Sequence, residues 1–358
     1  MITHKLKYIV AAGLLLASSL TMAGNEDRAG QAGANELLIN PWARSGGWGG
    51  ANAAIVKNVE AMSLNVGGLS FCKGTEVTFA HSQWLKGSGI NINALGLAQK
   101  VGESGALGIS LVSLDFGNIE RTTEKNPDGG NGNFTPQFFT IGLAYSKEFS
   151  NSIHGGITVR AISEAIADVK SQGIALDAGI EYVTGFNKER NNLKFGIALR
   201  NVGAPMKFDG EGLSYRNDNS NASGGTVDIN VLQQQKADRF ELPSLVNIGA
   251  AYDIKAGEDH RFTPAITFTS NSFIRDQFAL GLEYGFKNLF MIRGGYTFDK
   301  KDKNAIIDYQ ISALLGPSAG ISLQLPLGKS GKYFGIDYSY RATKTFDGTH
   351  TFGARFVL

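Results

Sequence analysis

The chain has 358 residues with 46 Gly, 8 Pro and 10% aromatic residues, and its formal net charge is +2. This charge excludes the strongly basic footprint of a nucleic-acid-binding protein, and the single Cys72 excludes an internal disulfide framework. Abundant Gly without a collagen period, together with many Phe and Tyr, is typical of tightly packed strands that end in aromatic residues.

The N-terminus has the three parts of a secretory signal. Lys5 and Lys7 form a basic region, an apolar run covers residues 8–16, and Ala23 offers a small residue for cleavage. The apolar run is too short to cross a bilayer, which takes about 20 residues. We therefore predict a signal peptide over residues 1–23. No long apolar stretch follows it, which excludes a helical membrane protein.

Side chains alternate between apolar and small or polar types in many segments, as the final residues illustrate. Phe352, Phe356 and Leu358 fall on one face of the predicted last strand, and Thr351 and Arg355 fall on the other. A half-buried soluble sheet also alternates. Here the apolar faces repeatedly end in aromatic residues, and the opposite faces mix small residues with charges of both signs. This combination favours strands with lipid on one side and a polar lumen on the other.

The alternation recurs in an even number of segments, as expected for a single-chain bacterial barrel. Strands are expected near residues 75–84, 90–100, 106–116, 137–149, 153–163, 173–184, 193–201, 244–254, 260–270, 276–285, 289–298, 316–325, 333–341 and 350–358. The fold class is therefore all-β: a transmembrane antiparallel β-barrel of about 14 strands over residues 73–358, surrounded by the lipid of the outer membrane. If both termini are periplasmic, the long connections lie outside, and these are residues 117–136, 202–243, 299–315 and 342–349. Asn304–Leu315 could be a strand or a short helix, and it is assigned to an external loop.

Residues 24–72 are too long for a simple lead-in to the barrel. The segment contains Trp42, Arg44, Trp48 and Asn65, and its Gly-rich stretch 46–50 allows sharp turns. A barrel of this size needs a plug or leaves a channel. We predict a plug in the lumen. The alternative is a flexible periplasmic tail, but such tails are poor in Trp and other apolar residues.

The sequence shows no catalytic, cofactor or metal-binding pattern. None of the five histidines has metal-ligand spacing with Cys or another His. The turn-rich residues 126–134 resemble a calcium loop only loosely, and we interpret them as turns. Buried charges in a lumen need partners, and the predicted inward charges balance one another. They are Arg160, Asp177, Glu181, Arg200, Glu283, Arg293, Asp337 and Arg355. In the long connection 202–243, a partner-binding surface is predicted at Met206, Phe208, Leu213 and Tyr215.

Several stretches carry a family resemblance. ARSGGWGGANAA (43–54) followed by NVGGLSF (65–71), RNVGAPMKF (200–208), ELPSLVNIGAAYDI (241–254) and QLPLGKSGKYFGIDYSY (324–340) resemble PorV/PorQ-type proteins, which belong with FadL-like barrels. The resemblance implies an outer-membrane barrel of a Bacteroidota-like bacterium that works in type IX secretion. It also implies binding to the C-terminal signal domains of secreted cargo proteins, beside a translocon or surface attachment complex.

Three functions remain open from the sequence. The first is this cargo-binding barrel. The second is a FadL-like transporter for hydrophobic small molecules, which requires an apolar pocket in the lumen and a break in the barrel wall. Because the inward strand faces are small or charged, the sequence favours the first. The third is a structural barrel without a transport role.

Overall fold

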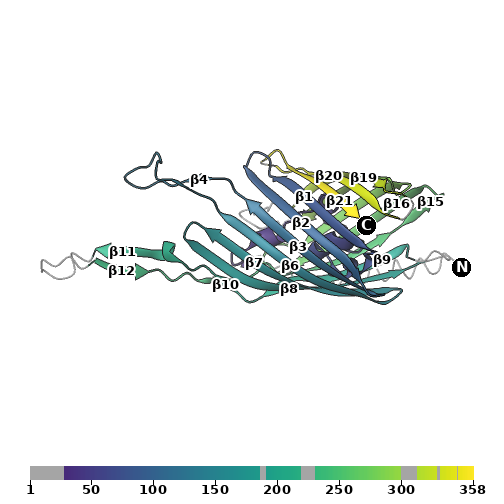
Figure 1. Cartoon of the computed structure of the whole chain (residues 1–358), viewed down its shortest axis with the longest axis horizontal. Coiled ribbons are helices and arrows are strands. Elements are labelled where there is room, and N and C mark those ends of the chain that lie inside the picture. The colour runs from purple at the N-terminus through teal and green to yellow at the C-terminus, as the bar shows by residue number, and fades with distance from the viewer. Residues whose placement is uncertain (1–27, 186–190, 219–229, 300–312, 329–330, 345) are drawn as a thin grey trace.

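A computed structural model shows an antiparallel barrel closed by hydrogen bonds between its first and last strands (Figure 1). It describes residues 28–185, 191–218, 230–299, 313–328, 331–344 and 346–358. The wall strands are β1 (Thr75–Trp84), β2 (Ile90–Val101), β3 (Gly105–Asp115), β6 (Gln137–Ser150), β7 (Ile153–Ile166), β8 (Val169–Thr184), β9 (Leu193–Gly203), β14 (Leu245–Tyr252), β16 (His260–Asn271), β17 (Gln277–Phe286), β18 (Phe290–Asp299), β19 (Gly316–Pro326), β20 (Tyr333–Arg341) and β21 (Thr349–Val357). The short β15 (Ile254–Ala256) pairs with β16 just beyond the end of β14.

The wall strands follow one another around the barrel in sequence order, and β1 pairs with β21 from Glu76 opposite Val357 to Gln83 opposite His350. The predicted fold class is confirmed, and its architecture is that of an outer-membrane barrel. The fourteen predicted strands agree with the observed ones to within a few residues. The sequence analysis missed short pairings in the connections: β4 (Ile119–Glu120) with β5 (Asn133–Phe134), β10 (Met206–Lys207) with β13 (Arg239–Phe240), and β11 (Ser214–Asp218) with β12 (Asn230–Gln234).

The outer surface of the barrel is an apolar band. On β21, Phe352 and Phe356 are about half exposed, whereas Thr351 and Arg355 are buried inside, as the alternation predicts. Exposed Leu, Ile, Val, Phe and Tyr side chains recur on the other wall strands, which suits lipid contact. None of the helices among the described residues is long and apolar enough to cross a membrane.

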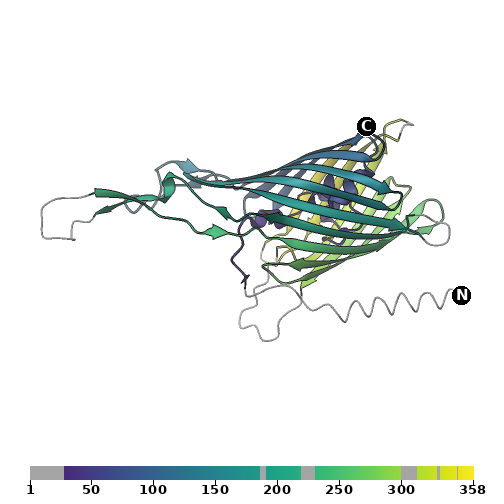
Figure 2. The same cartoon turned by 90° about the horizontal axis from the view of Figure 1, so that it is seen from below.

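The two ends of the barrel differ. The connections that hold β4 and the β11–β12 hairpin project from one end, which we call the long-loop end (Figures 1 and 2). The other, short-turn end carries brief turns such as the one from β2 to β3 and the final residue of the chain. The predicted signal peptide (1–23) and most of Asn304–Leu315 lie outside the described residues.

Residues 28–72 are here called the plug segment, and most of them fold inside the barrel (Figure 2). They form short helical turns: η2 (Asn35–Leu38), α2 (Ala43–Gly46), η3 (Asn58–Ser63) and η4 (Val66–Phe71). Trp42, Val59, Met62 and Leu69 form a buried cluster with small wall residues such as Ala94. The plug segment is therefore a packed part of the protein.

Glycines on the inner wall make room for the plug. A Cβ at Gly281 would lie 2.7 Å from the Trp48 ring, and one at Gly320 would lie 3.0 Å from Gly47 Cα. Both positions demand close approach of the wall to the plug. The wall glycines in this situation are Gly96, Gly108, Gly142, Gly179, Gly196, Gly249, Gly281, Gly295, Gly320 and Gly353. Part of the high Gly content is therefore explained by the close contact between the inner wall and the plug.

Candidate functional site

The plug is tied to the wall by buried polar groups. The Asn65 side-chain amide donates hydrogen bonds to the carbonyl oxygens of Ala53 (3.0 Å) and Ile180 (3.1 Å), and its Oδ1 accepts one from the amide of Gly67 (3.1 Å). Trp42 is fully buried, and its Nε1 donates to Ser63 Oγ at 2.9 Å. Because each group is satisfied, the plug is held in one position.

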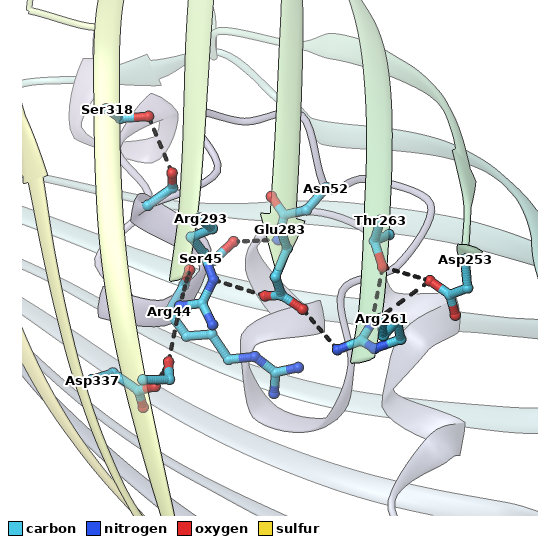
Figure 3. Close-up of polar contacts among 12 residues, drawn as sticks. Arg44, Ser45, Asn52, Asp253, Arg261, Thr263, Glu283, Arg293, Ser318 and Asp337 are labelled. Atoms are coloured by element: carbon cyan, nitrogen blue, oxygen red, sulfur yellow. Dashed lines mark hydrogen bonds and ion pairs between the residues drawn. The ribbon is translucent and has the colours of Figure 1, made fainter. Parts of the chain in front are cut away.

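A continuous belt of charged and polar side chains runs along one half of the inner wall (Figure 3). Arg293 Nε lies 2.8 Å from Glu283 Oε2, and Arg261 Nη2 lies 2.8 Å from Glu283 Oε1. Arg261 also lies 3.6 Å from Asp253, which pairs with Lys194 at 2.5 Å. Each charge of this half of the belt therefore has an opposite charge beside it.

The belt continues through Ser322 to the last two strands. Arg293 Nη1 donates to Ser322 Oγ at 2.9 Å, and Ser322 donates to Asp337. Arg355 Nε donates to Asp337 Oδ2 at 2.6 Å. The sequence analysis named four of these belt residues and missed Lys194, Asp253, Arg261 and Ser322. Lys194 could have been predicted as an inward charge, because the next residue of the strand, Phe195, faces outward.

The remaining predicted lumen charges lie on β7, β8 and β9. Arg160 pairs with Asp177 at 2.5 Å and donates to the Met62 carbonyl oxygen of the plug at 3.0 Å. Arg200 donates to the Leu37 carbonyl oxygen at 3.1 Å. Glu181 is buried, and its two carboxylate oxygens have no hydrogen-bond partner among the described residues. The structure therefore does not bring Arg200 and Glu181 together as a pair.

The plug separates two chambers in the lumen. The outer chamber, toward the long-loop end, encloses about 100 Å³. The inner chamber, toward the short-turn end, encloses about 300 Å³ and is lined by much of the charged belt. Apolar side chains of the outer chamber come from the plug (Leu38, Leu64) and from residues at the ends of wall strands (Trp84, Leu245). The alternation along a strand does not indicate whether residues of the plug or of strand ends face the lumen. The sequence analysis therefore predicted no apolar surface there.

The wall itself is interrupted beside the outer chamber. Pairing between β9 and β14 begins at Arg200 opposite Leu245, so the last residues of β9, 201–203, have no partner on β14. The register between β8 and β9 also shifts at Asp177, and Asn201 has a left-handed backbone with φ 59°. A groove of about 400 Å³ lies here, lined by side chains such as Leu199, Val202, Leu242, Leu245 and Asn271. We call it the wall groove.

The predicted partner-binding residues do not form one exposed surface. Met206 is buried against Ile162 and Leu242, and the Phe208 ring centre lies 5.6 Å from that of Phe240. Leu213 is half-buried, and of the four only Tyr215, on the projecting hairpin, is about half exposed. Three of the four therefore pack within the connection 202–243 or near the barrel rim.

Among the described residues, no group of three or more His, Cys, Asp or Glu side chains is arranged to hold a metal ion. Most of the buried polar groups of the lumen are joined to one another and to the plug. A buried serine and histidine are also in contact, since Ser70 Oγ of the plug lies 2.8 Å from His154 Nδ1 of β7.

No protein-family model matches the chain, and no curated protein matches its sequence. Solved structures of similar fold include the Pseudomonas putida toluene transporter TodX, with a TM-score of 0.53 at 10% identity over 89% of this chain and 97% of that one. They also include the CymD monoaromatic hydrocarbon channel, with a TM-score of 0.51 at 12% identity over 89% and 97%. A Pseudomonas aeruginosa FadL homologue has a TM-score of 0.50 at 12% identity over 87% and 98%.

At these identities the likeness concerns the fold. It agrees with the predicted outer-membrane barrel, and these neighbours are themselves named as a channel and a transporter. Nothing in the comparisons supports the narrower placement with PorV/PorQ proteins, a role in type IX secretion or a Bacteroidota source. What is established is that the chain has the fold of FadL-type outer-membrane channels.

Proposed function

We propose that the chain is an outer-membrane channel for hydrophobic small molecules, which enter the outer chamber and leave sideways through the wall groove. The observation that carries this proposal is the position of Leu245 and Asn271, which line both the outer chamber and the wall groove. The alternative weighed from the sequence thus has the better support. That alternative requires an apolar surface in the lumen and a break in the wall. The outer chamber and the wall groove, which lie side by side, could meet these two requirements.

The plug and the charged belt argue for a sideways exit. The plug contacts the wall closely at the wall glycines. The belt of paired charges lies on the side of the plug away from the outer chamber. A hydrophobic molecule that displaced water from these charges would meet a large desolvation penalty. Leu199 and Val202 line the groove and face the lipid, so a molecule leaving there passes from the groove directly into apolar surroundings.

The proposal is tested by filling the groove. Val202→Trp should reduce uptake of radiolabelled toluene by cells that carry the protein in their outer membrane, by about tenfold relative to the unaltered chain. Ile197→Trp is the matched control, since Ile197 is an exposed lipid-facing residue of the same strand that does not line the groove. Equal uptake by both folded variants would contradict a sideways exit. Toluene uptake no faster than in cells lacking the protein would contradict the channel function itself.

A second function, the binding of secreted proteins implied by the PorV/PorQ resemblance, is proposed only for the projecting hairpin. Tyr215 and Leu232 are exposed there, on β11 and β12, well beyond the barrel (Figure 1). Tyr215→Ser combined with Leu232→Ser should then abolish co-purification of secreted proteins while toluene uptake persists. Identical sets of bound proteins from the altered and unaltered barrels would contradict this function.

A further inference from the structure

The inner chamber holds two cationic side chains of the plug that the charged belt leaves without partners. Arg44 and Lys57 both line it, and neither side chain has an ion pair or hydrogen bond to another described residue. Figure 3 shows Arg44 beside Arg293 and Glu283, with no interaction drawn to its guanidinium. The Lys57 ammonium lies 4.8 Å from the centre of the Phe71 ring. Uncompensated cations in a partly dry site are costly, and a bound anion would remove that cost.

The carboxylates around this chamber are already paired with other cations or are only partly ionised. Of its three acidic lining residues, Asp253 pairs with Lys194 and Arg261, and Glu283 pairs with Arg261 and Arg293. The third is Glu60 of the plug, which is buried, and its burial raises the pKa of its carboxyl to about 7. Glu60 therefore carries only part of a charge at neutral pH.

Other nearby charges make no ion pair or hydrogen bond with the two plug cations among the described residues. Glu181 lies behind η4, where a Cβ on Gly68 would meet its Oε1 at 2.7 Å, and it does not line the chamber. Burial lowers the pKa of Lys57 to about 8, and the neighbouring Lys194 adds to this effect. On the wall, Arg293 keeps one nitrogen, Nη2, without a hydrogen-bond partner among the described residues.

We propose that the inner chamber is a binding site for a small hydrophilic dicarboxylate, held by Arg44 and Lys57. A guanidinium matches the two oxygens of one carboxylate, and an ammonium binds a second as a point charge. Asn52, Thr263 and Gln324 line the same space and offer neutral polar groups to the remaining oxygens. A purely hydrophobic ligand would leave both cations without a counter-charge. The site is thus distinct from the outer chamber and does not depend on hydrophobic transport.

The test is calorimetric titration of the purified barrel in uncharged detergent at pH 7, with malonate as the probe. We expect saturable binding of one malonate and none of malonamide, which has a similar size without the charges. Lys57→Gln and Arg44→Gln should each weaken malonate binding at least tenfold, and Lys57→Arg should restore most of it. Lys332→Gln is the matched control, because Lys332 is an exposed cation at the same end of the barrel outside the chamber.

Heat-modifiable gel mobility establishes that each variant is folded, and the two glutamine variants act independently, so a folding failure in one leaves the other decisive. The proposal is overturned if the unaltered barrel binds no malonate, if malonamide binds equally well, or if folded Lys57→Gln binds malonate as tightly as the unaltered protein. Because this measurement involves no uptake, loss of toluene transport would leave its result unchanged.

Discussion

Asn65 of the plug donates a hydrogen bond to the Ile180 carbonyl oxygen in the middle of β8, at 3.1 Å. The same side chain bonds Ala53 and Gly67 within the plug. One amide thus joins two turns of the plug to one wall strand. This contact helps to hold the plug between the two chambers of the lumen.

Asn65→Leu should loosen the plug without unfolding the barrel. It removes two hydrogen bonds to carbonyl oxygens and one from an amide, at a cost of about 1–3 kcal/mol for each buried group that is left unsatisfied. Limited proteolysis should cut residues 28–72 faster in this variant, while the heat-modifiable gel shift of the barrel persists. Asn126→Leu, in an exposed part of an outer connection, is the control. Unchanged cleavage in Asn65→Leu would show that the plug is held by packing alone.

Gly281→Leu should push the plug from its seat. A side chain at residue 281 collides with the Trp48 ring, and overpacking of this kind costs about 1–3 kcal/mol. Displacement of the plug should open the lumen, so this variant should conduct ions in a planar bilayer where the unaltered barrel conducts little. Gly294→Leu on the neighbouring strand has no such collision, since the nearest atom lies 3.7 Å from its Cβ position. Equal conductance of the two variants would contradict this role for Gly281.

Arg355→Met should destabilise the barrel by about 3–5 kcal/mol, because Asp337 is left as a buried charge without its main partner. Replacing both residues, as Arg355→Met with Asp337→Leu, should recover most of the loss. Urea-unfolding midpoints followed by gel mobility measure both effects. For the exposed pair Arg28–Glu241, Arg28→Met should cost no more than about 1 kcal/mol. A double variant as unstable as the single one would show that the pair itself is stabilising.

Docking of the N-terminal part of the plug should weaken as the pH rises. Burial, followed by the neighbouring Glu164, raises the pKa of the Glu36 carboxyl from 4.5 to about 8. Between these values the docked plug keeps a proton that the free segment releases. Its stabilising contribution is therefore complete below pH 4.5 and is lost by pH 8.

Protease cleavage near residues 28–40 should accordingly be faster at pH 9 than at pH 6. Glu36→Gln, which cannot ionise, should remove this dependence, whereas Glu124→Gln at an exposed position should keep it. A pH profile that is the same in Glu36→Gln as in the unaltered chain would assign the effect to another group.

The strand pattern was predictable because it is local. Alternation along β21 placed Phe352 and Phe356 toward lipid and Arg355 toward the lumen, and the structure agrees. The plug was predictable in outline, since Trp42 and Trp48 in a Gly-rich segment need a buried place. Pairing of particular charges was harder to predict. Arg200 and Glu181 lie on neighbouring strands, but Glu181 is opposite Gly196, four residues along β9 from Arg200, so the two charges do not pair.

By itself, the sequence determined the barrel, its strand count and its lipid-facing side, because side-chain direction in a strand depends only on position along the chain. Only the tertiary structure decided where the lumen is apolar, where the wall is interrupted and which cations remain unpaired. Leu64 and Leu245 meet in the outer chamber, and Arg44 and Lys57 reach the inner one, through contacts between segments far apart in the chain. Such contacts depend on strand register and on the path of the plug, which no local pattern encodes.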